Sequence, residues 1–380
     1  MFSGLFFFFG SLLVAMVVAI AIIRSSHLHA HLSMDGDLSG PQKFHVVPTP
    51  RVGGVPVMAG LMLAAAGAWS EGLPEFAYLL WAGLPVFLAG LAEDVTKRVR
   101  PLYRLLSAFV SALIAVWLLG AILPVLGIPW LDQALRGLPW LALLVTVFAV
   151  GGVCHAVNII DGYNGLMGGV AMAIAGALAY VSFTVGDTAL LAISLSLLGA
   201  ILGFLVWNFP RGMIFAGDAG AYLVGFLLAE VSVLLVVRHP GVLSPWFPML
   251  LMIYPVFETV FSIYRKKFVR QMSPGMPDGL HFHMLIYKRL VRWMVGKREA
   301  KHLLRRNSLT APYLWSVALF SVMPATLFWQ YEWVLQLCCV LFVLMYVWLY
   351  RRIVQFRAPR WLVLRRVESD TRSKLVIKSR

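Results

Sequence analysis

Long apolar runs, separated by short polar stretches, fill most of this chain. A helix needs about 20 apolar residues to cross the hydrocarbon of a bilayer, and about eleven segments meet that requirement. In lipid, a single segment satisfies its own backbone hydrogen bonds as a helix. The pattern therefore predicts an all-α, polytopic integral membrane protein with about ten to eleven transmembrane helices. The predicted spans are 3–23, 54–70, 76–93, 103–123, 139–157, 166–184, 188–207, 219–237, 246–264, 312–329 and 333–350.

The composition agrees with a membrane protein. Of the 380 residues, 60% are hydrophobic and 13% are charged, whereas soluble domains are about half apolar and a quarter charged. The net charge of +15 does not indicate nucleic-acid binding, because membrane proteins retain Lys and Arg on their cytoplasmic side. We predict one membrane domain, residues 1–350, followed by a basic cytoplasmic tail, residues 351–380, that lies on anionic membrane lipid.

The distribution of basic residues predicts the orientation. If the N-terminus is placed outside and the spans alternate, only Arg136 and Arg238 among the 32 Lys and Arg fall on the outward side. Such an asymmetry indicates an outward N-terminus and an inward C-terminus. We therefore expect a multi-pass membrane protein, with any nucleotide-dependent site facing the cytoplasm.

The acidic residues are informative because a charge in the middle of a span costs at least ~2.5–3.5 kcal/mol. The predicted topology brings several chemically active side chains, from separate helices, to the same inward face. They are Glu93 and Asp94 after the third span, Asp161 after the fifth, Asp218 at the start of the eighth, and His281 and His283 in a long inward loop.

Each of these features also has a simpler interpretation. Glu93 and Asp94 fit a solvated helix end that precedes basic residues. Asp161 lies in a Gly-containing stretch, 158–166, that fits an ordinary turn. Asp218 precedes a helix, where Asp is a preferred N-cap.

The combination favours chemistry on phosphates. Two phosphate-bearing substrates repel each other, so a site that joins them needs a divalent cation and carboxylates to hold it. Mg²⁺ prefers oxygen ligands, and basic side chains bind phosphate through charge-assisted hydrogen bonds. We expect a Mg²⁺ site, with Mn²⁺ as the alternative ion.

Five stretches between about 35 and 290 carry a family resemblance. They are Lys43–Gly54, Gly90–Asp94 with Arg104, Asn158–Leu166, Asn208–Gly225, and Pro255–Thr259 with Arg265 and His281–His283. In this order the chain resembles the polyprenyl-phosphate N-acetylhexosamine-1-phosphate transferases of glycosyltransferase family 4. That family begins lipid-linked cell-wall and O-antigen glycans in bacteria, so the resemblance implies a protein of the bacterial inner (plasma) membrane.

The resemblance implies a function and a set of residues. The enzyme would transfer a sugar-1-phosphate from a UDP-sugar to undecaprenyl phosphate, a polyprenyl phosphate acceptor, and release UMP. A homodimer is left open. The implied metal ligand is Asp218, the implied catalytic residues are Glu93, Asp94 and Asp161, and the implied substrate-binding residues are Lys43, His45, Asn158, Asn164, Asn208, Phe215, His281 and His283. Phe215 would stack on uracil, and the two histidines would hold the diphosphate.

The sequence departs from the family pattern at several positions. Glu93 and Glu258 stand where Asp is usual, which keeps the charge, and Met284 stands where a third His is common. Asn164 also replaces an Asp. It loses a charge, which argues against a role as a base and suggests a different sugar preference.

The rival interpretation is a membrane transporter of a small solute or lipid-linked substrate. Glu230 and Glu258 would then form an ion relay within the membrane. Transporters often contain internal repeats and polar sites near the bilayer midplane. We find no repeat, and the polar clusters lie at helix ends, so the sequence favours an enzyme.

Overall fold

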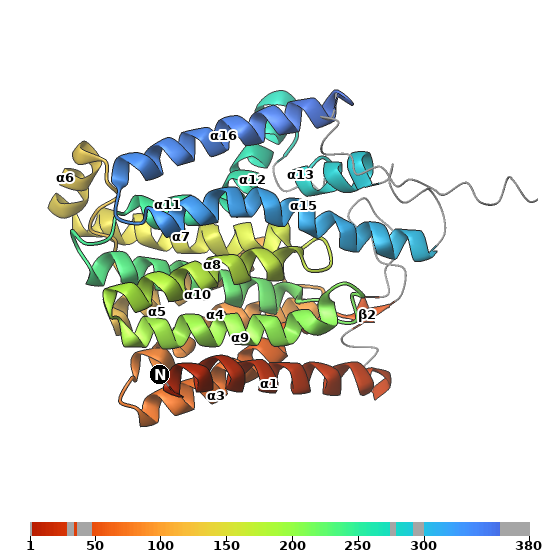
Figure 1. Cartoon of the computed structure of the whole chain (residues 1–380), viewed down its shortest axis with the longest axis horizontal. Helices are drawn as coiled ribbons and strands as arrows, with labels where there is room; N and C mark the ends of the chain where they lie inside the picture. The colour runs from red at the N-terminus through yellow and green to blue at the C-terminus, as the bar shows by residue number, and fades with distance from the viewer. Residues whose placement is uncertain (1, 29–33, 36–47, 274–278, 292–299, 358–380) are drawn as a thin grey trace, which may run out of the picture.

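The computed structural model describes residues 2–28, 34–35, 48–273, 279–291 and 300–357. The long helices of this part lie side by side in one bundle (Figure 1). They are α1 (Phe2–Arg24), α3 (Gly54–Ser70), α4 (Glu75–Thr96), α5 (Pro101–Leu119), α7 (Pro139–Ile160), α8 (Leu166–Val185), α9 (Thr188–Asn208), α10 (Gly217–Arg238), α15 (Ala300–Leu327) and α16 (Glu332–Val354).

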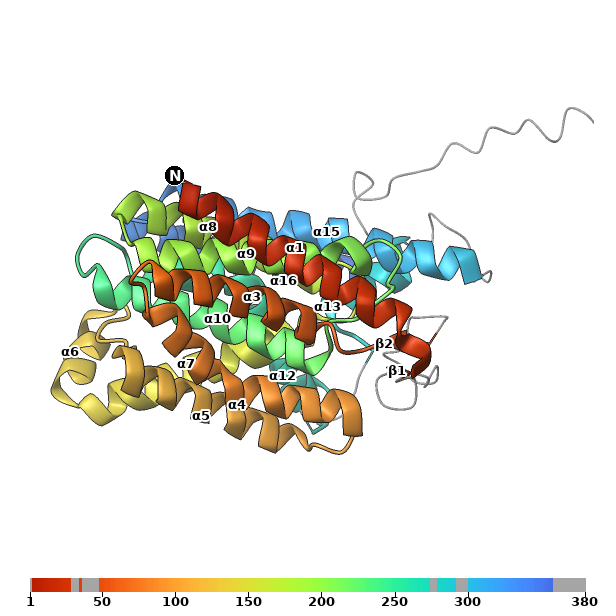
Figure 2. The same ribbon diagram turned by 90° about the horizontal axis from the view of Figure 1, so that it is seen from below.

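Shorter elements complete the described chain. They are α6 (Pro129–Gly137), α11 (Trp246–Leu251), α12 (Ile253–Tyr264), α13 (Phe282–Leu285), the π-helices η1 (Arg265–Val269) and η2 (Ile286–Val291), and the antiparallel strands β1 (Met34–Asp35) and β2 (Thr49–Pro50). Both views place β2 and α13 at the end of the bundle opposite the N-terminus (Figures 1 and 2).

The predicted all-α membrane fold is confirmed. Eight helices among the described residues are long and apolar enough to cross a bilayer, and α3 is a shorter apolar helix. The ninth predicted span, 246–264, is instead interrupted at Met252 between α11 and α12. Pro255 explains the break, because its ring clashes with the carbonyl of Leu251 four residues earlier. The tenth predicted span, 312–329, corresponds to α15, which begins earlier, at Ala300.

Helix α10 lies at the centre of the bundle. Every residue from Gly217 to Val236 is buried, and α3, α4 and α7 pack against it. Small residues allow the backbones to touch, since a Cβ added to Gly54 would lie 2.4 Å from the backbone N of Gly220. The start of α10 is thus fixed by its neighbours, and it carries Asp218.

Candidate active site

β2 and the segment after it run alongside the residues before α10, joined by a short ladder of backbone hydrogen bonds. Phe215 N–H donates to Pro50 O at 2.8 Å, and Gly53 N–H donates to Phe215 O at 2.8 Å. Gly54 N–H then donates to the carbonyl of the following residue at 2.9 Å. Arg51 lies within this ladder, so the backbone pairing carries its side chain to the N-terminal end of α10.

Asp94, at the end of α4, caps the N-terminus of α10. Its Oδ1 accepts the backbone N–H of Asp218 at 2.8 Å, and its Oδ2 accepts that of Ala219 at 2.9 Å. The side chain is fully buried. Gly217 makes the approach possible, because a Cβ there would lie 2.4 Å from Asp94 Oδ2 and its φ is +69°. A carboxylate at a helix N-terminus satisfies unpaired N–H groups and complements the helix dipole.

The carboxylate of Asp218 itself contacts side chains from three other segments. Its Oδ1 lies 3.5 Å from Nη2 of Arg51 and accepts the amide N–H of Asn158 at 3.2 Å. Its Oδ2 pairs with Nη1 of Arg104, near the start of α5. Arg51 Nη2 also lies 3.8 Å from Asp94. Two guanidinium groups therefore compensate two buried carboxylates, as buried charges require.

Asp161 follows α7 and belongs to the same electrostatic cluster. Burial raises the pKa of its carboxyl from 3.8 to about 7, and the positive charge of Arg51 partly opposes that shift. A group whose pKa lies near 7 changes its charge around neutral pH. The acidic residues predicted to gather, Asp94, Asp161 and Asp218, thus share one guanidinium neighbour.

The turn after Asp161 is held by side chains from two helices. The backbone N–H of Asn164 donates to Asn307 Oδ1 at 2.7 Å. The N–H of Gly165 donates to Asn208 Oδ1 at 2.7 Å, and its carbonyl accepts Nε1–H of Trp315 at 2.9 Å. Asn307 and Trp315 both belong to α15, so this helix clamps the turn against α9.

Asn164 and Asn208, predicted to bind substrate, have buried side chains that hold backbone groups in this structure. Asn208 Nδ2 donates to Ile214 O at 2.8 Å, in addition to its contact with the turn. Asn164 Nδ2 donates to Pro210 O at 3.2 Å. Their observed contacts shape the walls of the site.

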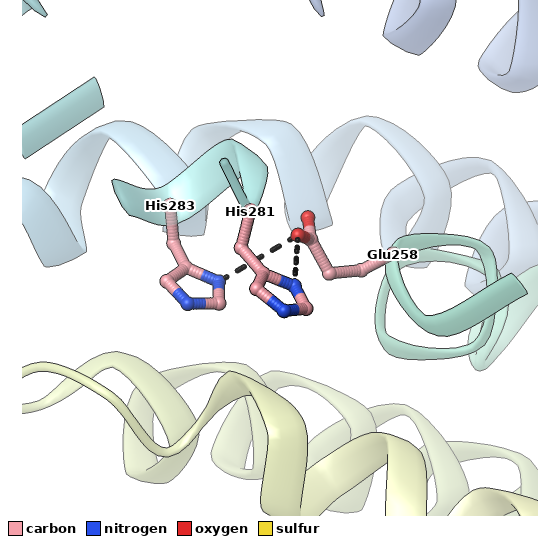
Figure 3. Close-up of side chains that lie close together, drawn as sticks. All are labelled: Glu258, His281 and His283. Carbon is pink, nitrogen blue, oxygen red and sulfur yellow. Dashed lines mark ion pairs between the residues drawn. The ribbon is translucent and has the colours of Figure 1, made fainter. Parts of the chain in front are cut away.

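A second cluster, which we call the histidine cluster, consists of Glu258, His281 and His283 (Figure 3). All three are buried, and their potential ligand atoms lie within 4.8 Å of one another, a set that could hold a metal ion. The rings of Tyr163 and His283 meet edge to face, 5.7 Å between centroids. The histidine cluster therefore lies against the turn that carries Asp161.

Two further predicted residues, Glu93 and Phe215, have other contacts. Glu93 Oε2 accepts the backbone N–H of Val99 at 2.8 Å, in the loop after α4. Phe215 is partly buried within the ladder. Lys43 and His45 lie outside the described residues.

Sequence reasoning missed four residues of this site. Arg51 and Arg104 were counted only as inward-facing charge and motif positions, although both lie in the stretches that carry the family resemblance. Asn307 and Trp315 follow the stretch of family resemblance, and nothing in the local sequence marks them as partners of the turn.

One comparison with known proteins covers most of these elements. The family description "Glycosyl transferase family 4" matches residues 76–236, which include Asp94, Asn158, Asp161 and Asp218. The match supports the predicted resemblance to glycosyl transferase family 4 over that stretch. The protein is a phosphoglycosyl transferase and a multi-pass membrane protein.

Several curated relatives of this chain have specific names. The probable undecaprenyl-phosphate N-acetylglucosaminyl 1-phosphate transferase of Bacillus subtilis is 26% identical over 65% of this chain and 68% of its own length. The undecaprenyl-phosphate alpha-N-acetylglucosaminyl 1-phosphate transferase of Thermotoga maritima is 28% identical over 68% of this chain and 74% of its own. The protein of the same name from Yersinia pestis is 28% identical over 65% of this chain and 68% of its own.

Proposed function

We propose that this enzyme transfers an N-acetylhexosamine-1-phosphate from a UDP-sugar to undecaprenyl phosphate and releases UMP. The main observation in support is the meeting of Asp94, Asp218, Asn158, Arg51 and Arg104 at one end of the bundle, from separate segments. The names of the relatives contain a transferred group of this class, N-acetylglucosaminyl 1-phosphate, and the same acceptor, undecaprenyl phosphate. Sugar transfer of this kind would begin a lipid-linked glycan pathway.

The position of the site supports a cytoplasmic orientation. Arg51 and Arg104 lie at the site. Arg136, in α6, and Arg238, at the C-terminal end of α10, lie at the opposite end of the bundle. Basic residues are retained on the cytoplasmic side of bacterial membranes. We place the enzyme in the bacterial inner membrane, with its donor reached from the compartment that contains nucleotides.

The oxygen donors at the start of α10 fit Mg²⁺, or Mn²⁺ in its place. Asp218 and Asp161 offer carboxylates, and the side-chain amide of Asn158, whose nitrogen donates to Asp218, also carries an oxygen. Both ions prefer such hard oxygen ligands. Asp218 would be the main ligand, and the bound ion would neutralise the negative charge of the diphosphate.

The side chains of this chain would bind and orient both substrates. Arg51 and Arg104 compensate Asp218 here, and their planar guanidinium groups also suit phosphate oxygens. His281 and His283 would donate to the donor diphosphate. Phe215, which is partly exposed beside Arg51, would stack on the uracil ring.

We propose direct attack by the acceptor. An oxygen of the polyprenyl phosphate attacks the β-phosphorus of the donor, and the bond from that phosphorus to the UMP oxygen breaks. The acceptor phosphate is already anionic, so positioning and charge neutralisation supply most of the acceleration. Both oxygens of Asp94 accept backbone N–H groups, so we assign it to holding Asp218 rather than to covalent attack.

Purified enzyme, undecaprenyl phosphate and a panel of labelled UDP-sugars test this proposal. We expect labelled lipid and stoichiometric UMP with at least one UDP-N-acetylhexosamine, and reversal when UMP is added. Asp218→Asn should lower turnover by on the order of 100-fold or more. The matched control is Asp187→Asn, at the opposite end of the bundle, where Asp187 pairs with Arg238 and His239. No transfer from any UDP-sugar, or full activity in Asp218→Asn, would contradict the proposal.

A further inference from the structure

The carboxylate of Glu258 occupies the centre of the histidine cluster (Figure 3). The residue is 1% exposed, and its Oε1 lies 3.3 Å from Nδ1 of His281 and 3.7 Å from Nδ1 of His283. The same oxygen accepts the backbone N–H of Phe282 at 2.8 Å, and Oε2 accepts the hydroxyl of Tyr346 at 2.6 Å. One carboxylate thus contacts both histidines, the backbone between them and helix α16.

The position of the carboxylate favours a proton on the Nδ1 of each ring, at 3.3 Å for His281 and 3.7 Å for His283. Both oxygens of Glu258 already accept hydrogen bonds, so an Nδ1 that faces them acts as the donor. The two rings are stacked, with centroids 5.2 Å apart and planes 13° apart. Figure 3 shows that both Nε2 atoms point the same way, on the side of the rings away from Glu258.

The Nε2 side faces the turn that carries Asp161. Nε2 of His283 lies 3.5 Å from the position that a Cβ on Gly162 would occupy. Gly162 directly follows Asp161, and the next residue, Tyr163, meets the ring of His283 edge to face. The two histidines therefore connect buried Glu258 to the region where the donor diphosphate is proposed to bind.

We propose that Glu258 is a positioning residue of this transferase, which holds His281 and His283 with Nδ1 protonated and Nε2 directed at the donor diphosphate. The inference rests on the proposed function, in which these histidines bind that group. A carboxylate beside an imidazole fixes the ring's orientation and tautomer and stabilises its protonated form. A protonated ring can then donate from Nε2 to an anionic ligand.

Glu258→Gln and Glu258→Asp test the role of the charge. Gln keeps the size but loses the charge, and we expect kcat/KM for the donor to fall on the order of 10–100-fold, with KM for the acceptor unchanged. Asp keeps the charge and should recover a large part of the loss. Tyr346→Phe is the matched control, because it removes the contact at Oε2 and leaves the contacts to both rings; it should change kcat/KM less than about 3-fold.

A double-mutant cycle separates positioning from general destabilisation. If Glu258 acts through the histidines, Glu258→Gln adds little further loss in a His283→Ala enzyme. Spectra of the [¹⁵N]histidine-labelled protein should show Nδ1 protonated in the wild type and a tautomer mixture in Glu258→Gln. Additive losses, or unchanged spectra, overturn the inference. If Glu258→Gln does not fold, the wild-type spectra alone decide, because histidine rings protonated on Nε2 rather than Nδ1 overturn the inference.

The controls also separate this inference from the proposed function. If His281→Ala and His283→Ala leave the donor KM unchanged, the assignment of these histidines to the donor is wrong. If they raise that KM while Glu258→Gln does not, only the inference about Glu258 is wrong. A transition metal that copurifies with the wild type and is lost in Glu258→Gln would also overturn it, because Glu258 would then be a ligand.

Discussion

The carboxylate of Asp94 accepts the backbone N–H of Asp218 at 2.8 Å, although 124 positions separate the two residues. Asp94 thereby fixes the first turn of α10, which contains Asp218. Because Asp94 supplies the cap, the side chain of Asp218 is directed to Arg51, Arg104 and Asn158. The two carboxylates have different tasks, and their order in the chain gives no sign of this.

Asp94→Ala should lower both stability and turnover. It leaves two buried N–H groups at the start of α10 without acceptors, at a cost of about 1–3 kcal/mol each. Asp187→Ala is a matched control, since Asp187 accepts the N–H of Leu190 as the cap of α9 at the other end of the bundle. Thermal unfolding in detergent should shift for both variants, while transfer activity falls only for Asp94→Ala. Equal activity losses would refute a special role for the α10 cap.

The pKa of Asp161 predicts a pH dependence near neutrality. Burial raises this pKa to about 7, so the carboxyl is protonated below that pH and ionised above it. An ionised group attracts a cation, so the affinity for Mg²⁺ and for the donor should rise between pH 6 and pH 8. Asp161→Asn should give a lower, flatter profile of donor kcat/KM. An unchanged slope in Asp161→Asn would assign the titration to another group.

The same pKa has a consequence for stability. In the unfolded chain the carboxyl of Asp161 ionises near 3.8, whereas in the folded protein it ionises near 7. Between these values the folded state binds the extra proton, so stability falls as pH rises through that window. Asp161→Asn should therefore stabilise the protein more at pH 8 than at pH 4, as measured by thermal unfolding.

Asn307→Ala tests whether α15 holds the turn after Asp161 in place. The change removes the acceptor of the Asn164 N–H, and a buried unpaired donor costs about 1–3 kcal/mol. We expect a lower unfolding temperature and a higher KM for the donor. Ser316→Ala is the control, because Ser316 is exposed on the same helix and donates to Pro312 O within that helix. A normal donor KM in Asn307→Ala would show that the turn keeps its position without the clamp.

Glu230 distinguishes the enzyme from a transporter. It is fully buried in α10, and neither carboxyl oxygen has a hydrogen-bond partner among the described residues. Replacing a buried polar group that lacks a partner with Met should stabilise the protein by about 1–3 kcal/mol. We expect Glu230→Met to raise the unfolding temperature and to retain transfer activity. Loss of activity with an intact fold would give this carboxyl a function.

Much of the membrane fold could be predicted because hydropathy is a local property. A run of about 20 apolar residues is stable across a bilayer whatever its neighbours are, so the helices of the bundle were located from the chain alone. The broken span at Met252 was missed because the prediction followed hydropathy and disregarded Pro255. The early start of α15 at Ala300 was missed because its first turns are polar.

The order of the acidic motifs and their common membrane face were also readable from the chain, since charges avoid lipid and the spans alternate. The partners of those acids were not. Three contacts depend on how segments distant in sequence pack: the cap that Asp94 forms on α10, the pairing of Arg51 with Asp218, and the hydrogen bond of Asn307 to the turn after Asp161. Such contacts arise from backbone approach and burial of particular groups in three dimensions, and one-dimensional hydropathy and motif spacing carry no information about them.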